Sequence, residues 1–571
     1  MYILIDKFNG VVPGVSPRLL TNEFAQTAEN IEFESGVIDP IYVDGASVHT
    51  LQGSTYRSIF YYDDTYWLEW AEDGVSVVDS PLANDAYARL YWTGEDYPRV
   101  GTVDSMITGS SGYPAASYRL GVPYPEGAPG VAKSGTADDE EVPLEVSYVY
   151  TLVTSIGEEG PPSDPSDILS VTSAETVTVT MPSVDVPSGN YQLSTGATKR
   201  IYRSNTGSEY TEYQFVAEVP IATTTYADVF ADTFLGEVLP SSGWIGPPDD
   251  DSSLYPDGPL EGLIFVANGI MAGHTEKSVC FCEPYLPHAW PIDYRYTLDA
   301  KIVGIGSTPN GVVALTDGKP YFITGADPSS MTDIRVNFSQ ACVNARSIVD
   351  MGDYILYASP DGLCSIQDNQ GAIVTRGLIG VKDWRANWYP EDIRATEHEG
   401  CYVAFWKDGF SYGGWVYDPR SDRSTLSTLT ASEEVRGTFY DENSGITYKI
   451  IDDEIIPHRQ HASTRATATW KSKKFIMQSP VSLGWLAVDA DGYPVTVKVY
   501  VDGTEISDDT ISLSGSQLQQ TVNSGPTTVN IHEPIIRLPA VVGTVWEVEI
   551  ITQQVVNRVV LAQTMGELKS V

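Results

Sequence analysis

The sequence predicts an all-β, multi-domain protein, and three observations carry this prediction. The chain has 571 residues, too many for a single hydrophobic core. It is rich in Tyr (34), Gly (49) and Pro (36). Aromatic side chains suit pleated, half-buried surfaces, while Gly and Pro form the turns between strands. Apolar residues alternate with polar ones over short stretches, and helical periodicity is nearly absent.

The charge is strongly negative, with 76 acidic against 34 basic residues and a formal net charge of −42. Proteins hold nucleic-acid backbones through Lys and Arg, so a chain this acidic should not bind DNA tightly. Two interpretations stay open. The charge either keeps a passage for DNA non-adhesive or serves solubility and tolerance of salt.

Residues 1–50 are expected to form an N-terminal segment that docks to a propeller-like body or to an adaptor protein. Within it, residues 22–30 (NEFAQTAEN) are the best helix candidate, with Asn22 as the cap and Phe24, Ala25 and Ala28 on one face. The segment begins MYILIDKFNG, which has no basic leader or cleavage site and so predicts no signal peptide.

Residues 51–140 read as the first part of a propeller-like body. Two aromatic strands meet at a turn formed by Asp63 and Asp64, and a third strand follows the turn at Asp73–Gly74. A Pro- and Gly-rich stretch then runs into the acidic ADDEE sequence. The composition changes there, which predicts a domain boundary.

Residues 141–247 are expected to form a separate sandwich of about one hundred residues. The stretch resembles a fibronectin type III domain, on Tyr148 and Tyr150 before EEGPPS and on KRIYRS as a later central strand. This resemblance implies a fold, since such modules carry no function by themselves.

Residues 248–457 contain short β-units at spacings of about 40 to 50 residues, as propeller blades do. Turn sequences such as Asn268–Gly269 separate the strands. We therefore predict one propeller-like body built from residues 51–140 and 248–457, with the sandwich inserted between them.

Residues 458–571 predict a second, jelly-roll-like β-sandwich. Its clearest signal is the alternation of Val495, Val497, Val499 and Val501, which places four valines on one face of a strand.

No catalytic, cofactor or metal site is predicted. The chain has no G-x-S-x-G, H-E-x-x-H, Walker A or G-x-G-x-x-G motif. Five scattered Cys predict buried, reduced thiols, and His458 and His461 have no further ligand near them in sequence. No segment is long and apolar enough for a membrane span, and we expect synthesis in a cytoplasm.

Two features are candidates for a subunit interface. One is a basic strip within sixteen residues, comprising Arg459, Arg465, Lys471, Lys473 and Lys474. It either docks an acidic neighbouring subunit or protects an exposed strand edge. The other is the aromatic stretch HAWPIDYRYTL, in which Trp290, Tyr294 and Tyr296 either anchor a contact or pack within the propeller.

Several segments resemble structural proteins of short-tailed phages. They are the N-terminal stretch with Pro17–Leu20, Ala28, Asn30 and Gly36, and the sequences RLYWTGEDYPRV, EPYLPHAWPIDYRYTL, RSIVDMGDYILYASPDGL and WKSKKF. The architecture is most similar to the tail nozzle family, also called tail tubular protein B.

The resemblance implies a virion tail component, assembled in the host cytoplasm. It implies a homo-hexameric ring below a dodecameric tail adaptor, with tail fibres or spikes alongside. DNA would pass through the lumen without tight binding, and no enzymatic activity is implied. The alternatives are a receptor-binding tail fibre or spike and another head-completion or collar protein.

Overall fold

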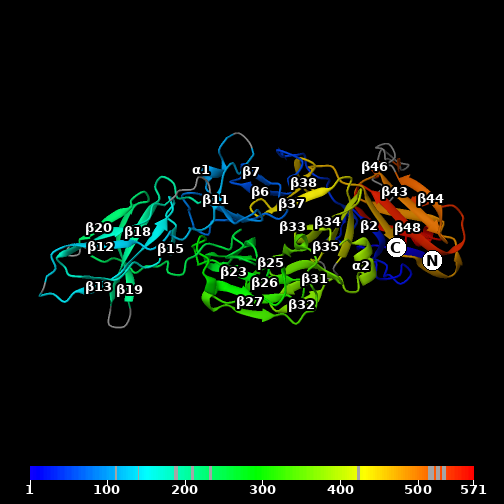
Figure 1. Cartoon of the computed structure of the whole chain (residues 1–571). Coiled ribbons are helices and arrows are strands. Elements are labelled where there is room, and N and C mark those ends of the chain that lie inside the picture. The colour runs from blue at the N-terminus through cyan, green and yellow to red at the C-terminus, as the bar shows by residue number, and fades with distance from the viewer. Residues whose placement is uncertain are drawn as a thin grey trace. The chain divides into compact units, whose positions relative to one another are not determined.

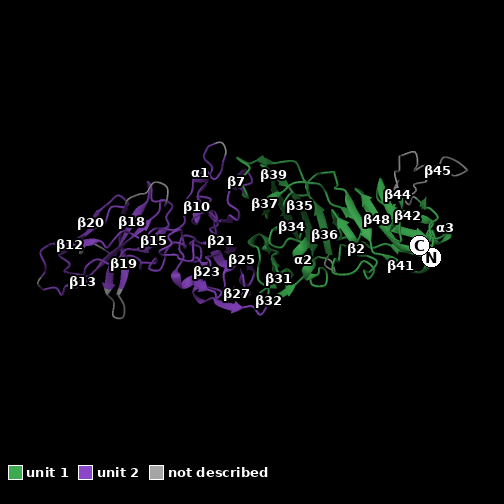
Figure 2. Ribbon diagram, turned by 45° about the vertical axis from the view of Figure 1, so that its right-hand side comes forward, with its two compact units in different colours: residues 1–59, 340–571 green, residues 60–339 purple. Residues whose placement is uncertain are grey.

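The computed structural model describes residues 1–109, 112–138, 140–184, 191–206, 211–229, 234–420, 425–511, 520–521, 528–529 and 535–570 (Figure 1). Nearly all of its regular structure is β, which confirms the predicted class. The α-helices in these ranges are short: α1 (Val103–Met106), α2 (Val381–Asn387) and α3 (Met565–Leu568). The chain divides into two compact units (Figure 2). Unit 1 holds residues 1–59 and 340–571, and unit 2 holds residues 60–339.

Unit 2 contains three four-stranded antiparallel sheets whose strands follow one another in chain order, the form of a propeller blade. The hairpin between β21 and β22 turns at Asn268 and Gly269, both at positive φ, as the Asn-Gly signal predicted. The three sheets are β8 (Ser76–Asp79), β9 (Leu90–Thr93), β10 (Arg99–Gly101) and β11 (Tyr118–Arg119); β21 (Glu261–Val266), β22 (Ile270–His274), β23 (Ser278–Phe281) and β24 (Arg295–Thr297); and β25 (Ile302–Thr308), β26 (Gly311–Thr316), β27 (Tyr321–Thr324) and β28 (Thr332–Arg335).

A β-sandwich also belongs to unit 2. Tyr148 and Tyr150 of one sheet and Val177 and Val179 of the other share one buried core, so the two sheets pack face to face. The sandwich begins at Gly130, earlier than the predicted residue 141, because β12 pairs along the whole of β17. Its sheets are β12 (Gly130–Gly135), β17 (Glu175–Thr180) and β20 (Thr225–Val229); β15 (Glu159–Pro162), β14 (Tyr148–Val153), β18 (Thr198–Thr206) and β19 (Thr211–Pro220); and the pair β13 (Leu144–Val146) and β16 (Leu169–Val171).

A buried ion pair joins this sandwich to the first blade-like sheet of unit 2. Arg89, which precedes β9, lies 2.8 Å from Glu158 of the β14–β15 turn and 2.7 Å from Asp85. Both Arg89 and Glu158 are almost fully buried. Removing one partner of such a buried pair strongly lowers stability, so this pair helps to hold the sandwich against the first blade-like sheet.

Unit 1 contains two further sheets of the blade type. The second of them is completed by β5 from the N-terminal segment, whose Thr50 and His49 lie opposite Glu454 and Ile455. The two sheets are β29 (Val349–Asp350), β30 (Ile355–Ser359), β31 (Gly362–Gln367) and β32 (Gln370–Ile373); and β37 (Val435–Asp441), β38 (Ile446–Ile451), β39 (Glu454–Pro457) and β5 (His49–Thr50).

The largest sheet of unit 1 has ten strands and joins another blade-like meander to the C-terminal region. The joining strand is β2, which pairs in parallel with β36 and antiparallel with β40. In order, the strands are β33 (Arg394–His398), β34 (Cys401–Asp408), β35 (Ser411–Asp418), β36 (Thr425–Thr430), β2 (Ala25–Glu29), β40 (Ala468–Ser472), β48 (Gly543–Thr552), β43 (Val495–Val501) and β44 (Thr504–Ile511), with β41 (Phe475–Val481) also paired to β48.

The helix predicted at residues 22–30 was therefore wrong, because residues 25–29 are strand β2. Ala25 and Ala28 are both buried, as the helical pattern required. The register against β40 shifts between Ala25 and Thr27, and this irregularity brings both alanines to the buried face. Backbone pairing with strands on both sides outweighs a weak helix propensity.

The C-terminal region is a sandwich to which the N-terminus contributes. Val495, Val497, Val499 and Val501 are all buried, as their alternation predicted. They share a core with the facing sheet, which consists of β1 (Tyr2–Ile5), β49 (Val556–Ala562), β42 (Trp485–Ala490) and β47 (Ile535–Arg537).

The N-terminal segment is thus part of unit 1. Its strands β1, β2 and β5 enter three different sheets. Gly10 lies so close to Leu426 that a Cβ atom there would stand 2.1 Å from the backbone carbonyl oxygen. Two-stranded sheets complete the described structure: β3 (Ile31–Glu32) with β4 (Asp39–Pro40), β6 (Ser58–Tyr62) with β7 (Tyr66–Trp70), and β45 (Gln520–Thr521) with β46 (Thr528–Val529).

Candidate functional sites: an acidic hollow and a buried charge network

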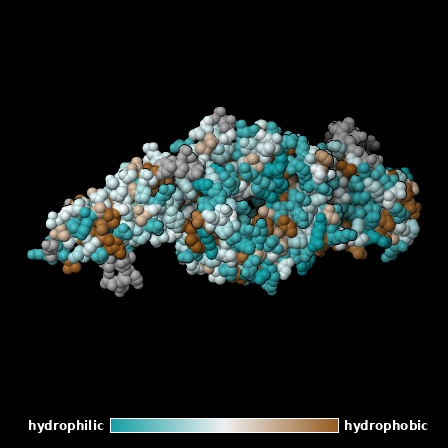
Figure 3. Space-filling view, in the orientation of Figure 1, coloured by the Kyte–Doolittle hydropathy of each residue, from teal (hydrophilic) through white to brown (hydrophobic). Residues whose placement is uncertain are grey.

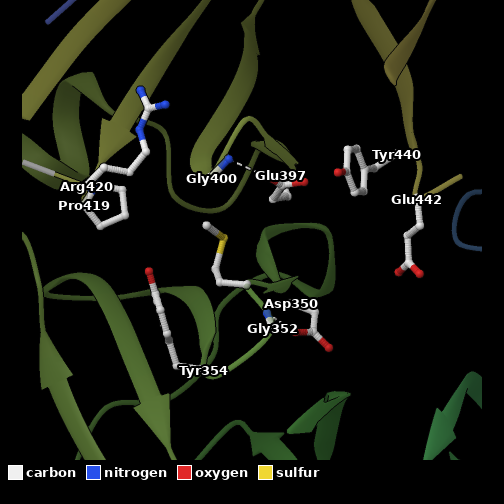
Figure 4. Close-up of a pocket in the computed structure, with 10 residues that line it drawn as sticks. Asp350, Gly352, Tyr354, Glu397, Gly400, Pro419, Arg420, Tyr440 and Glu442 are labelled. Atoms are coloured by element: carbon white, nitrogen blue, oxygen red, sulfur yellow. Dashed lines mark hydrogen bonds between the residues drawn. The ribbon is translucent and has the colours of Figure 1, made fainter. Parts of the chain in front are cut away.

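A hollow of about 440 Å³ opens in unit 1 where turns of neighbouring blade-like sheets meet (Figure 4). Strand β33 contacts both β29 and β37, which brings their connecting turns together. Residues of the β29–β30, β33–β34 and β37–β38 turns and of the end of β35 line the hollow: Asp350, Met351, Gly352, Tyr354, Glu397, Gly400, Pro419, Arg420, Tyr440 and Glu442.

Three carboxylates face this hollow. Burial raises the pKa of Asp350, and the negative charge of Glu442 raises it further. Glu397 accepts a hydrogen bond of 2.6 Å from the backbone N–H of Gly400. Burial and the charge of Glu397 raise the pKa of the Tyr440 hydroxyl. The hollow therefore offers several acceptors to a cation or a basic side chain.

Arg420 forms the basic side of the hollow. Its guanidinium lies 2.9 Å from Asp418, 3.1 Å from Glu32 and 3.0 Å from Glu34, so most of its charge is compensated from behind the hollow. The hydrogen bond to Asp418 raises the pKa of Arg420. Because Glu32 and Glu34 belong to the N-terminal segment, this arginine also fastens that segment to β35.

A buried charge network lies nearby in unit 1. The Asp44 carboxylate accepts hydrogen bonds from Lys449 Nζ at 2.5 Å, from His458 Nδ1 at 3.0 Å and from the backbone N–H of Arg459 at 3.1 Å. Lys449 and His458 are almost fully buried. A second histidine, His398, packs against His458 with ring centroids 4.9 Å apart.

Burial governs the protonation of this network. Burial raises the pKa of Asp44, but the hydrogen bond to His458 and the charge of Lys449 outweigh that effect and the net pKa is lowered. Burial lowers the pKa of His458, and the charge of Lys449 lowers it further. For His398, burial and the charge of Arg459 lower the pKa to about 3. Both imidazoles are therefore neutral near pH 7. The network binds Asp44 of the N-terminal segment to Lys449, His458 and Arg459 and so holds that segment in place.

The predicted basic strip is divided between two places. Arg459 and Arg465 lie against the N-terminal segment, where Arg465 pairs with Asp39 and stacks over Tyr42 at 4.7 Å. The three lysines belong to the C-terminal region. Lys471 lies 3.8 Å from Glu549 and 4.1 Å from the Tyr500 ring; Lys474 lies 3.8 Å from Glu547; and Lys473 lies over Phe475.

The aromatic stretch is buried around Trp290, whereas Tyr294 and Tyr296 are half-buried. Trp290 has no exposed surface, and its Nε1–H donates to the carbonyl of Pro287 at 2.7 Å. Of the two alternatives for Trp290, packing inside the protein is therefore the one that fits, because a fully enclosed side chain cannot reach a neighbouring subunit. Tyr296 is half-buried and donates to Pro328 at 2.7 Å, and burial raises the pKa of the half-buried Tyr294 to about 12.

Neither site could be selected from the sequence. The three acids of the hollow come from separate turns and are three among 76. His458 and His461 lie close together in the sequence but differ in their surroundings, because His458 is buried and His461 is exposed.

In the described ranges no group of three His, Cys, Asp or Glu side chains could hold a metal, and all five cysteines are buried with free thiols. Of the helices described, none is long and apolar enough to cross a membrane.

Comparisons with known proteins leave the family open. No family model matches the chain, and no curated protein matches it. Among solved structures, Hsv2 from Kluyvelomyces marxianus is 9% identical and aligns over 55% of this chain and 89% of its own, with a TM-score of 0.24. A protein from Lactobacillus plantarum is 11% identical and aligns over 58% of this chain and 92% of its own, also with a TM-score of 0.24.

Proposed function

We propose that the protein is a structural component of a phage virion that forms the tail nozzle, a hexameric ring around a channel for DNA. The channel retains the DNA until the host is engaged and then lets it pass. The tail adaptor above and tail fibres or spikes alongside are the proposed neighbours in the virion. The motifs of the N-terminal stretch and of WKSKKF, which resemble those of short-tailed phages, support this assignment.

The observation that carries the proposal is the net charge of −42. A conduit for a polyanion works best when its wall does not hold the polyanion, because each Lys or Arg contact to a phosphate releases counterions and adds affinity. Acidic side chains on the channel wall would repel the DNA and keep it mobile. The proposal assigns no enzymatic activity to the ring.

The blade-like sheets support a finer description of the fold. We assign them to a propeller-like body, the sandwich of residues 130–229 to a fibronectin type III-like insertion, and the C-terminal sandwich to a jelly-roll-like domain. In a ring of six copies these parts would act as rigid pieces, joined by subunit contacts rather than by flexible linkers.

The charge leads to a direct expectation for DNA binding. Linear double-stranded DNA should show no retarded complex at protein concentrations up to about 10 μM in about 50 mM salt, where a non-specific basic binder retards it completely. A gel-shift titration beside a basic DNA-binding protein of similar mass measures this. Salt-dependent retardation by the pure protein would contradict a non-adhesive channel.

The acidic hollow is the observation that favours a second candidate, a receptor-binding fibre or spike that degrades host polysaccharide. Paired carboxylates with one raised pKa are the groups that glycoside hydrolysis uses. Under the nozzle proposal, host polysaccharide incubated with the protein should release no oligosaccharide. Release that disappears in an Asp350→Asn variant would instead support the fibre or spike. A head-completion or collar protein would share the structural class and differ in its place in the virion.

A further inference from the structure

A small basic and apolar surface lies on unit 1 at the start of β41. It consists of Arg18, Leu19, Lys473, Lys474 and Ile476, and we call it the basic patch. The backbone N–H of Lys474 donates to the carbonyl of Pro17 at 3.0 Å, which places the turn carrying Arg18 and Leu19 beside the lysines. The turn itself is closed by a hydrogen bond of 2.8 Å from Leu19 to Ser16.

Arg18, Leu19 and Ile476 of the basic patch are exposed, and its two lysines are half-buried. Leu19 is 76% and Ile476 is 48% exposed, so two apolar side chains lie next to the cations. Lys474 approaches Glu547 only to 3.8 Å. Across the described part of the chain, no carboxylate forms an ion pair with Arg18 or Lys473. In a chain with a net charge of −42, such unpaired cations stand out.

The chemistry of the basic patch specifies its occupant. Large apolar side chains surrounded by polar ones mark protein interaction surfaces, and complementary charge fixes partner and orientation. The occupant should therefore be a protein surface that presents exposed apolar side chains among several carboxylates.

The same chain carries such a surface on the sandwich of unit 2. We call it the acidic tip, and it consists of Asp138, Glu140, Val142, Leu144 and Glu145. Val142 is 83% and Leu144 is 55% exposed, and the three acids beside them are exposed as well. Figure 3 shows an apolar patch over the end of the sandwich that carries β12 and β13.

We propose that the acidic tip of one copy docks on the basic patch of the next copy in the assembly. The contact is head-to-tail, because the two surfaces differ, and head-to-tail contacts generate rings when the rotation closes. Val142 and Leu144 meet Leu19 and Ile476, while the carboxylates pair with Arg18 and Lys473. This inference rests on the proposed ring, since it names the contact that builds it.

Charge reversal tests the contact. The patch variant is Arg18→Glu/Lys473→Glu, and the tip variant is Glu140→Lys/Glu145→Lys; these four side chains are at the surface or half-buried, so both variants should fold as the parent does. Each variant places like charges across the contact. We expect each to raise the protein concentration needed for assembly at least about tenfold, as measured by analytical ultracentrifugation.

Mixing the two variants supplies the decisive comparison. In a one-to-one mixture each basic tip meets an acidic patch and each acidic tip meets a basic patch, so alternating rings should form at the parent's concentration. A misfolded variant or a contact within one chain cannot be rescued in this way. The variant Lys277→Glu/Lys382→Glu changes the net charge as the patch variant does, but at other exposed sites, and should assemble like the parent.

The outcomes separate this inference from the proposed function. A parent protein that stays monomeric overturns the ring, and with it the contact. A parent that assembles while either reversed variant assembles equally well overturns the contact alone, as does a mixture that fails to recover. DNA retardation that the patch variant loses, with assembly unchanged, would assign the basic patch to DNA and also overturn the contact.

Discussion

Replacing Asp44 by asparagine should lower the free energy of unfolding of unit 1 by about 3 kcal/mol. Asparagine keeps the shape of the side chain and loses its charge, which leaves the buried Lys449 ammonium without its counterion and His458 without its carboxylate acceptor. Removing one partner of a buried pair usually costs about 3–5 kcal/mol, and Asp44 itself is 33% exposed, which places the effect at the lower end. Denaturant unfolding followed by tryptophan fluorescence measures the loss.

Two further variants make the Asp44 result specific. Asp39→Asn breaks the more exposed pair with Arg465 on the same N-terminal segment and should cost about 1 kcal/mol or less. Adding Lys449→Met to Asp44→Asn removes the stranded charge and should restore most of the stability, because apolar replacement of a buried pair is often neutral. If Asp44→Asn and Asp39→Asn lowered the free energy of unfolding equally, this would contradict a special role of the buried network in holding the N-terminal segment.

Acidification from pH 7 to pH 5 should lower the stability of unit 1 through His398 and His458, with about 2 kcal/mol from His398 alone. Burial lowers both pKa values, to about 3 for His398. In the unfolded chain each histidine binds a proton near pH 6.5, whereas in the folded chain it does not. The unfolded state therefore binds more protons, and stability present above pH 6.5 is lost as the pH falls.

Unfolding titrations at several pH values between 5 and 7 check this sign and its origin. His458→Gln should remove part of the pH dependence and His398→Gln/His458→Gln nearly all of it, since glutamine does not titrate. His461→Gln, an exposed position three residues beyond His458, is the matched control and should follow the parent. A slope that survives the double replacement would place the pH dependence elsewhere.

The sequence predicts the parts of the fold that depend on local pattern. Period-two alternation identified Val495–Val501 as a buried strand, and the Asn-Gly pair located the turn of the β21–β22 hairpin. Both signals lie within a few residues of the structure they describe. Parts that depend on distant partners escaped prediction. Strand β2 is defined by its pairing with Thr428 and Lys471, which lie about four hundred residues or more along the chain, and its local composition suggested a helix instead.

The candidate sites depend even more on distant contacts. Asp44 acquires its role from Lys449 and His458, and the sequence distinguishes it in no way from the other acids. Arg465 of the basic strip pairs with Asp39 of the N-terminal segment, which the sequence did not indicate, and the role of the strip in a subunit interface stays a prediction. The charged residues in a sequence show that ion-pair partners are needed. Only the fold shows which of those partners lie within the same chain.

Electron microscopy of the assembled protein at moderate resolution tests the proposed function most directly. The proposal expects a sixfold ring with an axial channel and with acidic side chains concentrated on the channel wall. A threefold spike, a lone monomer or a basic wall would contradict it.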